Sequence, residues 1–466
     1  MKLRFAPSPT GFLHVGGART AIFNLLHAQR HGGIMLLRIE DTDVERSKRH
    51  HAEQIVQSLQ WLGVEWDEGP IYQSDRLDRY RERAGELVAS GKAYRCYCTV
   101  EELDAERSAA EGAGDAYRYS GRCRARAEAG QPQPEDVSHV IRFKVPGGAI
   151  EFHDLIRGAM HFEGELIDDF VLIRSDHNPT YHLSVVVDDV DMEITHVARG
   201  DDHLSNTPKH VLLFGAFGAP VPLFAHLPLI LGGDRKRLSK RSGATSAEEY
   251  RDMGIVPQAL FNFLTLLGWN PGGDRELISR DEAAEVFDLS DVNKAPAVFD
   301  PEKLLWMNGQ YLMRMTADEM YPHLVPFLGE KAAPLEELRA AIELNKGRGR
   351  TLKEIATQLE PYLAEDETLQ YEPEAAKKHL KGEDLAARLQ ELHDALAATE
   401  PFDVITAEQS LRALAEAHGI SAGKLIHPLR LALTGRGASP PIFDVAVVLG
   451  KERSLRRLRR LIATLP

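Results

Sequence analysis

The chain has 466 residues, which is more than one hydrophobic core usually organises, so its length predicts several domains. Hydrophobic residues make up 43% and charged residues 27% of it, a composition that is typical of globular domains and excludes a disordered or fibrous chain. The formal net charge of −14 argues against a generally basic nucleic-acid-binding protein, although phosphate contacts depend on local patches. No apolar run approaches the roughly 20 residues of a membrane span, no leader segment is recognisable, and three cysteines make no disulfide framework. We therefore expect a cytoplasmic protein with no membrane partner.

The first 40 residues predict the opening unit of a parallel sheet. Residues 2–6 are typical of a short strand, and two prolines and a glycine then form a tight loop. From Gly16 onward, apolar residues recur at helical spacing until two glycines end the helix, and residues 34–40 (IMLLRIE) form a nearly continuous apolar strand. Ligands of such a βαβ unit bind beyond the carboxyl ends of the strands, where we expect both the opening loop and Glu40.

The middle of the chain changes character near residue 92. Polar helical material and several β-rich stretches follow, and they predict an insertion into the sheet domain. An apolar run at residues 183–187 then predicts that a parallel strand resumes, and a second apolar run spans residues 225–231. After about residue 257 the chain becomes predominantly helical, and it ends in a helix whose leucines we expect to pack while its arginines face solvent.

Residues 5–17 (FAPSPTGFLHVGG) form a loop with phosphate-binding character. Helix N-termini leave backbone N–H groups unpaired, and Gly16 and Gly17 would let a nucleotide approach them closely. His14 is suited to donate a hydrogen bond to a phosphate oxygen, although a histidine that only supports the turn would look the same. A second loop, KRLSKR at residues 236–241, is suited to close on a triphosphate, with a solvated basic loop as the alternative. No Walker A pattern is present, which excludes a P-loop NTPase.

These two loops also resemble the signatures of a known family. PSPTGFLHVGG (residues 7–17) resembles the HIGH signature of class I aminoacyl-tRNA synthetases, and RLSKR (residues 237–241) resembles their KMSKS loop. RIEDTD (38–43), YHLSVVVDDVDMEITHVARGDDH (181–203) and FDPEKLLWMNGQYL (299–312) are similar to the bacterial glutamyl-tRNA synthetases in particular. The resemblance runs from residue 4 to about residue 462, which is too broad for chance agreement.

The resemblance implies a multidomain α/β plus α fold. A Rossmann-like parallel-sheet catalytic core would comprise residues 1–90 and 183–232, with an inserted α+β acceptor-stem-binding domain at residues 91–182. The KMSKS-type loop and a stem-contact region would occupy residues 233–312, and an all-α anticodon-binding region would occupy residues 313–466.

The resemblance also implies a ligase that activates L-glutamate with ATP and transfers it to the 3′-terminal ribose of tRNA(Glu). The residues that it implies in ATP binding are His14, Gly16, Gly17, Asp202, His203, Arg237, Ser239 and Lys240, with His14 and Lys240 as catalytic residues. Mg²⁺ would accompany the triphosphate, and we expect the enzyme to be a monomer.

Glutamate carries two carboxylates and one ammonium, so its pocket should offer two cations and one anion. Arg4 and Arg199 are suited to the carboxylates, and Glu40 is suited to the ammonium. Which arginine takes the side-chain carboxylate stays open. By resemblance, Ser8 and Tyr181 are the other amino-acid contacts. An arginine at the side chain would reject glutamine, because the amide of glutamine would point N–H groups at other donors.

Cys96, Cys98 and Cys123 resemble the zinc-site spacing of some enzymes of this family. The fourth ligand expected two residues after the last cysteine is Ala125, which cannot coordinate, so Tyr119 is the candidate instead. Three thiolates and one phenolate would complete a tetrahedral structural Zn²⁺ site, and three reduced, uncoordinated thiols are the alternative.

Arg348 and Arg350, in ELNKGRGRTLKE (343–354), are the anticodon candidates. In the family, an arginine at this place reads the third anticodon base and favours tRNA(Glu) over tRNA(Gln), although a non-discriminating enzyme that also charges tRNA(Gln) with glutamate remains the alternative. The helical end argues against a glutaminyl enzyme, which would carry a β-barrel part, and against a truncated tRNA-modifying relative. A nucleotidyltransferase for small molecules would need no anticodon region, and a non-catalytic tRNA-binding paralogue would have damaged signature loops.

Overall fold

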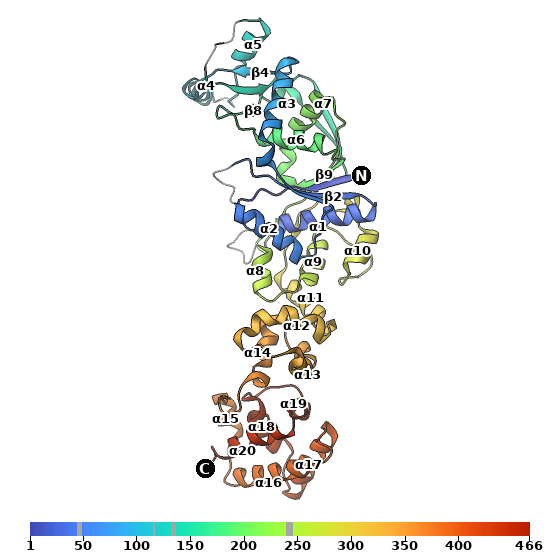
Figure 1. Ribbon diagram of the computed structural model, residues 1–466, viewed down its shortest axis with the longest axis vertical. Helices are drawn as coiled ribbons and strands as arrows, with labels where there is room; N and C mark the ends of the chain where they lie inside the picture. Colours follow the sequence, from blue (N-terminus) through green and yellow to red (C-terminus); the bar gives the residue numbers. More distant parts are fainter. Residues whose placement is uncertain (44–48, 115–116, 132–133, 135–136, 239–245) are drawn as a thin grey trace. The chain divides into compact units, whose positions relative to one another are not determined.

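The computed structural model describes residues 1–43, 49–114, 117–131, 134, 137–238 and 246–466 (Figure 1). The chain divides into two compact units: the first is Met1–Tyr250 with Leu260–Asp300, and the second is Arg251–Ala259 with Pro301–Pro466. Among the described residues, no helix is both long enough and apolar enough to cross a membrane.

A seven-stranded sheet with the order β3-β2-β1-β9-β10-β6-β7 organises the first unit. All neighbouring strands run parallel except for the antiparallel pair β6 and β7 at one edge. In the register of β1 and β2, Arg4 stands opposite Leu36 and Phe5 opposite Leu37. The strands are β1 (Lys2–Phe5), β2 (Ile34–Ile39), β3 (Glu68–Tyr72), β6 (Ala149–Asp154), β7 (Gly158–Glu163), β9 (His196–Gly200) and β10 (Leu223–Leu227).

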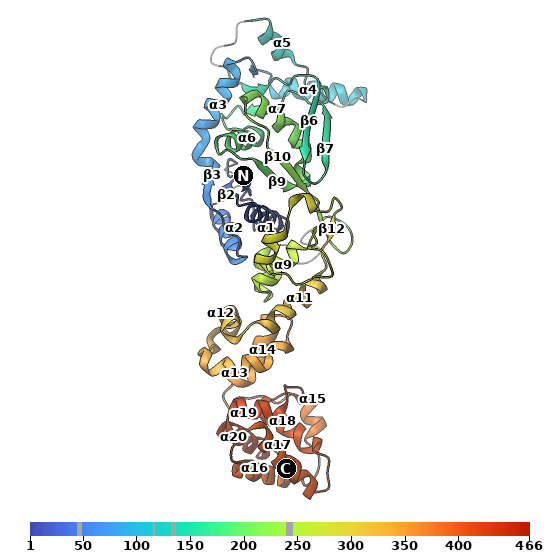
Figure 2. The same ribbon diagram turned by 90° about the vertical axis from the view of Figure 1, so that its right-hand side faces the viewer.

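Helices lie on both faces of this sheet, as expected of a Rossmann-like core (Figures 1 and 2). On one face are α1 (Val15–Arg30) and α2 (Arg49–Trp61), and on the other are α6 (Tyr181–Asp191) and α7 (Thr207–Phe217). Leu3, Phe23 and Leu36, from β1, α1 and β2, are fully buried. The predicted βαβ opening is therefore confirmed, because parallel pairing forces the intervening helix to cross over the sheet.

The prediction of a strand at residues 183–187 is wrong, because this run lies inside the helix α6. Leu183, Val186 and Val187 pack into a core with Leu213 and Phe214 of α7. The helix is buried from Leu183 to Asp189, so the sequence shows no polar face to reveal the helical period. A short apolar run of this kind does not distinguish a buried strand from a buried helix.

The span 91–182 contributes to two sheets. Its strands β4 (Ala93–Cys96), β5 (Val140–Phe143) and β8 (Val171–Ile173) form a separate antiparallel sheet, while β6 and β7 extend the main one. Helices α3 (Leu77–Ala89), α4 (Val100–Ala113) and α5 (Arg122–Glu128) lie near the small sheet in both views (Figures 1 and 2).

The first unit ends with short elements that follow the sheet. Two-stranded pairing joins β11 (Ile230–Leu231) to β12 (Ala297–Val298), and α10 (Arg280–Val286) contacts α1. Two helices, α8 (Ala247–Asp252) and α9 (Pro257–Thr265), cross the division between the two units.

The second unit is helical. Its helices are α11 (Pro301–Arg314), α12 (Ala317–Leu328), α13 (Leu335–Asn345), α14 (Leu352–Leu363), α15 (Pro373–His379), α16 (Leu385–Ala398), α17 (Val404–Ala417), α18 (Gly423–Thr434), α19 (Ile442–Leu449) and α20 (Lys451–Ile462).

In the last helix, α20, Leu458 and Leu461 are buried as predicted, but the prediction of solvent-facing arginines is wrong for Arg457. Arg457 is fully buried, and its Nε atom donates to Asp366 at 2.7 Å. A buried guanidinium needs such a carboxylate partner, so this arginine belongs to the core of the unit.

Candidate functional site

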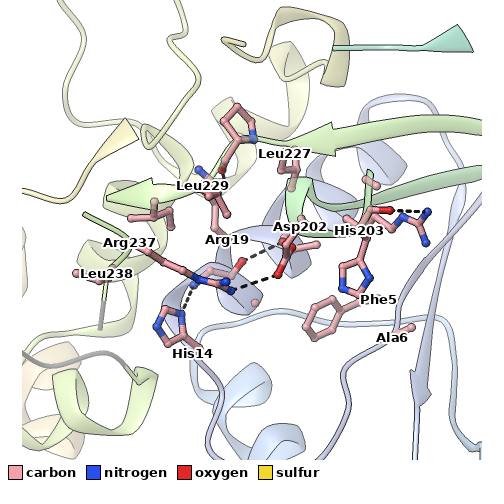
Figure 3. A pocket seen from close by; sticks show the side chains of 18 of the residues that line it. Phe5, Ala6, His14, Arg19, Asp202, His203, Leu227, Leu229, Arg237 and Leu238 are labelled. Atoms are coloured by element: carbon pink, nitrogen blue, oxygen red, sulfur yellow. Dashed lines mark hydrogen bonds and ion pairs between the residues drawn. The ribbon is translucent and has the colours of Figure 1, made fainter. Parts of the chain in front are cut away.

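A pocket of about 290 Å³ opens at the carboxyl ends of β1, β9 and β10 (Figure 3). Arg4 and Phe5 end β1, Arg199 and Gly200 end β9, and Leu227 ends β10. The first turn of α1, the 3-10 turn at Asp201–Asn206 and the segment 227–238 complete the lining. This is the sheet edge at which ligands of doubly wound folds bind.

His14 caps the N-terminus of α1 on this pocket. Its Nδ1 atom accepts a hydrogen bond from the Gly16 amide at 3.1 Å, so the neutral imidazole carries its proton on Nε2. Partial desolvation lowers the pKa of His14, and the Arg237 guanidinium lowers it further. The ring is therefore neutral near pH 7 and offers one N–H donor beside the helix N-terminus. The Gly17 amide precedes the first intrahelical bond, which runs from Ala18 to His14.

Arg237 extends between His14 and Asp202 at the mouth of the pocket (Figure 3). Its Nη2 atom lies 3.2 Å from Oδ2 of Asp202, and both side chains are largely exposed. An exposed ion pair of this kind is weak, so it can open when a stronger anion enters. The predicted site residues Ser239 and Lys240 lie outside the described residues.

Arg199 is a buried cation held entirely by neutral groups. Its Nε atom donates to Nε2 of His226 at 3.2 Å, and its Nη2 atom donates to Oγ1 of Thr207 at 2.7 Å. Its Nη1 atom reaches Tyr181 Oη at 3.3 Å and Nδ1 of His210 at 3.2 Å. None of its hydrogen-bond partners among the described residues is a carboxylate. The guanidinium is 6% exposed and burial lowers its pKa, so the site holds a positive charge that lacks a bonded anion.

His226 is itself oriented by Asp154 at the end of β6. Nδ1 of His226 lies 2.6 Å from Oδ2 of Asp154, which also accepts the His226 amide at 3.1 Å. The other oxygen of Asp154 accepts the amides of Ile156 and Arg157. Although burial opposes it, the bond from His226 helps to lower the pKa of Asp154, so this carboxylate stays ionised and keeps a proton on Nδ1 of His226. The Nε2 lone pair thereby faces both Nε of Arg199 at 3.2 Å and the Thr207 hydroxyl at 2.8 Å.

Arg4 differs from Arg199 because it is paired. Its Nε atom lies 3.2 Å from Oδ1 of Asp189, and the same carboxylate accepts Nη1 of the fully buried Arg38 at 2.7 Å. Arg38 also reaches Oε1 of Glu40 at 3.3 Å. Burial raises the pKa of Glu40, and the charges of Arg38 and Arg4 oppose that rise. Asp189 and Glu40 thus pair with Arg4 and Arg38, and Asp188 lies 3.7 Å from Arg38 as well. Among the described residues Arg199 has no carboxylate partner, and neither has the buried Arg19 of the same pocket, whose guanidinium donates to the carbonyls of Pro228 and Leu267.

The remaining predicted glutamate contacts differ in their bonds and in their exposure. Tyr181 begins α6, and its hydroxyl lies 3.0 Å from Nδ1 of His203, while burial raises its pKa to about 12. Burial and the charge of Arg199 lower the pKa of His203 to about 4, so both side chains are neutral near pH 7. The Glu40 amide bonds the Pro7 carbonyl at 2.9 Å, which joins the opening loop to the end of β2. Ser8 is exposed, and like Tyr181 and Glu40 it is not among the residues that line the pocket.

The residues that sequence reasoning missed are those that hold the arginines. Charged residues inside apolar elements were the available signal: Arg38 interrupts IMLLRIE, and the pair Asp188 and Asp189 follows a run of three valines. His226 and Asp154 carried no comparable signal, because they are distant in the sequence and meet only through the pairing of β6 with β10.

The cysteine cluster lies in the small-sheet region. Sγ of Cys98 is 3.6 Å from Sγ of Cys123 and 3.7 Å from the Tyr119 hydroxyl, which lies 3.3 Å from Sγ of Cys96. The Arg142 guanidinium stands 4.2 Å over the Tyr119 ring. Donors held 2.3 Å from a zinc ion in a tetrahedron would be about 3.8 Å apart, so three sulfurs and one oxygen fit such an ion.

The two anticodon candidates, which lie in the second unit, differ in their side-chain contacts. The Arg350 side chain bonds Glu302 at 2.9 Å, and its carbonyl accepts a bond from Asn308. Arg348 is exposed and makes no hydrogen bond or ion pair with any residue that the structure describes. Its charge helps burial to lower the pKa of Arg430 on α18, so the two guanidiniums are neighbours.

Comparisons with known proteins cover almost the whole chain. Residues 1–306 match the family model for the catalytic domain of class I tRNA synthetases (E and Q), and residues 319–462 match that of an anticodon binding domain. Glutamate–tRNA ligase 1 of Acidithiobacillus ferrooxidans is 46% identical over 99% of this chain and 99% of its own length. The glutamate–tRNA ligase of Geobacter sulfurreducens is 46% identical over 100% of this chain and 99% of its own length. Among solved structures, a glutamate–tRNA ligase from Elizabethkingia meningosepticum in complex with its amino acid superposes with a TM-score of 0.88 at 35% identity, with both chains covered in full.

Proposed function

Because the chain belongs to the glutamate–tRNA ligases of the class I aminoacyl-tRNA synthetases, we propose that its pocket activates L-glutamate with ATP and passes it to the 3′-terminal ribose of tRNA(Glu). The observation that carries this assignment is one pocket in which the unpaired cation Arg199 and the α1 N-terminus with His14 face the same space. The first suits a carboxylate, and the second suits a phosphate.

The buried cation Arg199 supports glutamate over glutamine. Arg4 and Arg38 are paired with Asp189 and Glu40, whereas Arg199 bonds no carboxylate among the described residues and can receive one from the substrate. Arg199 is the proposed partner of the side-chain carboxylate, so glutamine, whose side chain is a neutral amide, would leave it buried without an anion, which is costly. Glu40 is the anion proposed for the substrate ammonium.

The α1 N-terminus is the proposed phosphate site. Nε2–H of His14 and the Gly17 amide would donate to phosphate oxygens as negative charge develops, and Arg237 would exchange Asp202 for the triphosphate. Gly16, Asp202 and His203 border the same space. Ser239 and Lys240 are proposed here on resemblance alone.

The reaction follows as two displacements. The α-carboxylate of glutamate attacks the α-phosphorus of ATP, which forms glutamyl-adenylate and releases pyrophosphate. The terminal ribose hydroxyl, expected to be the 2′-hydroxyl in this class, then attacks the carbonyl carbon of that anhydride and AMP leaves. Positioning and charge stabilisation supply most of the catalysis, and Mg²⁺ would neutralise charge on the triphosphate.

The tRNA contacts are proposed on two parts of the chain. We infer that residues 91–182 bind the acceptor stem and that residues 313–466 bind the anticodon arm. Arg348 is the proposed reader of the third anticodon base, because its exposed side chain bonds no residue in the described part of the chain, whereas Arg350 is paired with Glu302. An enzyme that reads this base would discriminate against tRNA(Gln). Since one chain supplies both the pocket and the anticodon unit, we propose that a monomer suffices.

A structural Zn²⁺ ion is the proposed occupant of the cluster of Cys96, Cys98, Tyr119 and Cys123. The support is the spacing of the four donors, which fits a tetrahedral ion. The ion would cross-link the end of β4 to α5 and would take no part in the reaction.

ATP–pyrophosphate exchange tests the assignment. We expect exchange with glutamate in the presence of tRNA(Glu) and at most a trace with glutamine, because tRNA is commonly required for activation in this family. Exchange with glutamine alone would overturn the amino-acid assignment. Tight tRNA binding without exchange or charging would instead identify a binding protein.

Three variants of His14 separate capping from catalysis. His14→Asn keeps an acceptor for the Gly16 amide but removes the Nε2 donor, so we expect the activation rate to fall about 10²–10³-fold with little change in tRNA affinity. His14→Gln restores an N–H donor at that distance and should recover part of the rate. Phe12→Ala, at an exposed residue of the same loop, is the control. Equal rates in the wild type and His14→Asn would remove His14 from the catalytic residues.

A further inference from the structure

Three metal-ligating side chains converge at the end of α1 that lies away from the pocket. His27 and His31 are four residues apart in and just after the last turn of the helix, so they share a helix face. Asp288 precedes the 3-10 turn Leu289–Asp291, which follows α10. Nε2 of His31 lies 2.8 Å from Oδ2 of Asp288, and Nδ1 of His27 lies 3.9 Å from the same oxygen.

We propose that His27, His31 and Asp288 form a binding site for a divalent transition-metal ion such as Zn²⁺ or Ni²⁺. One ligand atom from each residue lies within 4.8 Å of the other two. Nitrogen and oxygen donors 2.0–2.2 Å from a tetrahedral ion stand about 3.3–3.6 Å apart, and the two distances to Asp288 bracket this range. Two imidazoles and one carboxylate suit zinc, nickel and copper, and three protein ligands leave a position for water.

The carboxylate is already oriented for this role. Its Oδ1 atom accepts hydrogen bonds from the Ser290 amide at 2.9 Å and from the Ser290 hydroxyl at 2.8 Å, which turns Oδ2 toward the histidines. Contacts of this kind fix the direction of a metal ligand and strengthen binding. The cluster also lies at the C-terminal end of α1, where the negative end of the helix dipole favours a cation.

One existing hydrogen bond limits the affinity that we expect for the metal ion. Nδ1 of His27 accepts the Leu289 amide at 3.3 Å, so an ion on that nitrogen would displace a hydrogen bond of a buried group. His31 is 41% exposed and must be ordered when the ion binds. Both effects weaken binding, and we therefore expect micromolar affinity. The bound ion would join the end of α1 to the segment after α10, two parts of the first unit that also pack together (Figure 1).

Isothermal titration of the untagged full-length chain with NiCl₂ and with ZnCl₂ tests the site, after a chelator has removed bound metal. We expect one equivalent of metal ion to bind with a micromolar dissociation constant. This binding should be lost in His31→Ala and weakened at least tenfold in Asp288→Asn. The same equivalent should persist in Cys123→Ser, which separates it from the cysteine cluster. His161→Ala is the matched control, because His161 is an exposed histidine beside Glu151 and Glu163 on the strand pair β6 and β7, away from the proposed site.

Stability and activity measurements complete the test. Added Ni²⁺ should raise the melting temperature of the wild type by a few degrees and leave that of His31→Ala unchanged, because only a folded site binds the ion. Aminoacylation by His31→Ala should equal that of the wild type. Wild type and His31→Ala binding the same number of ions with the same affinity would overturn the proposal. Equal losses in His31→Ala and His161→Ala would also overturn it, since they would indicate non-specific imidazole binding.

Discussion

One of the bonds that orient the Arg199 guanidinium depends on a lone pair of His226. If Asp154 holds the proton on Nδ1, then Nε2 accepts from Arg199; if the tautomer reverses, two N–H groups face each other. His226→Leu removes the acceptor, and we expect the KM for glutamate to rise about 10–100-fold, the value of a hydrogen bond to a charged group. The KM for ATP should change less than about threefold, because His226 does not face the phosphate end.

Two further variants separate positioning from packing at His226. His226→Gln places a carbonyl oxygen near the position of Nε2 and should recover most of the glutamate affinity. Asp154→Asn keeps the shape of the carboxylate but presents N–H groups to the ring, so it should resemble His226→Leu. If all three variants raise the two KM values equally, His226 acts only through stability.

At the residue scale, the ligand-facing groups were predictable and their supports were not. His14 and Arg199 stand in contiguous motifs, so the sequence was sufficient to select them. The pairing of Arg4 with Asp189, which makes the two predicted arginines unequal, depends on a helix far along the chain. Only the packed structure brings such groups together.

At the scale of elements, the short segment from β4 to α5 is the part that a zinc ion would hold. Few apolar residues pack there: the cluster around Tyr94, Cys96 and Cys123 is small. We expect about one equivalent of zinc in the untreated wild type and almost none in Cys123→Ser. Tyr119→Phe should release zinc to a competing chelator about tenfold more readily, because it removes one ligand.

Elemental analysis of the zinc content per chain tests the zinc proposal. Tyr117→Phe is the control, since Tyr117 contacts Arg107 rather than the cysteines. Unchanged retention in Tyr119→Phe would show that the phenol is not a ligand. Less than about half an equivalent in the wild type would contradict the zinc site itself.

Arg348 and Arg350 lie on one short segment but are predicted to differ in function. Arg348→Ala should lower kcat/KM for tRNA(Glu) about 10–100-fold and reduce the preference over tRNA(Gln), since it removes an unpaired guanidinium. Arg350→Ala should change it less than about threefold, because the ion pair with Glu302 competes with RNA for that guanidinium. Aminoacylation of both tRNAs by each variant decides the matter. A larger effect in Arg350→Ala would reverse the assignment.

Element types were predictable where the period was visible. In the opening βαβ unit the hydrophobic pattern switches clearly from strand to helix to strand, and the prediction of this unit is confirmed. The apolar run of α6 predicts a strand, which is wrong, because the helix is buried on nearly every side and is rich in valine. Its burial arises from the helices and the small sheet around it, and these contacts were not visible in the local sequence.

At the scale of the whole molecule, the two units should respond differently to acid. Burial lowers the pKa of His182 and His203, both in the first unit, to about 4, whereas an unfolded chain would restore a value near 6.5. The unfolded state therefore binds more protons between these values. The stability from the neutral histidines is complete above pH 6.5 and is lost as the pH falls toward 4. Each contributes about 2 kcal/mol of loss by pH 5.

Neighbouring carboxylates do not cancel this effect. The pKa of Asp154 and that of Asp189 are lowered from 3.8, so their contributions persist at pH 5. Glu40, whose pKa is raised, acts in the opposite direction and offsets part of the loss. We therefore expect the first unit to lose several kcal/mol between pH 7 and pH 5.

Urea unfolding followed by two probes separates the units. Trp61, Trp66 and Trp269 lie in the first unit and only Trp306 in the second, so fluorescence reports chiefly on the first. Circular dichroism reports on the helices of both units, so the transition that it shows without a counterpart in fluorescence is that of the second unit. The fluorescence midpoint should fall on the order of 1 M urea between pH 7 and pH 5, and the later dichroism transition should fall less. His182→Gln should reduce the shift, whereas His161→Gln, at an exposed histidine, should not. Equal shifts in both probes would contradict the assignment of the acid response to the buried histidines.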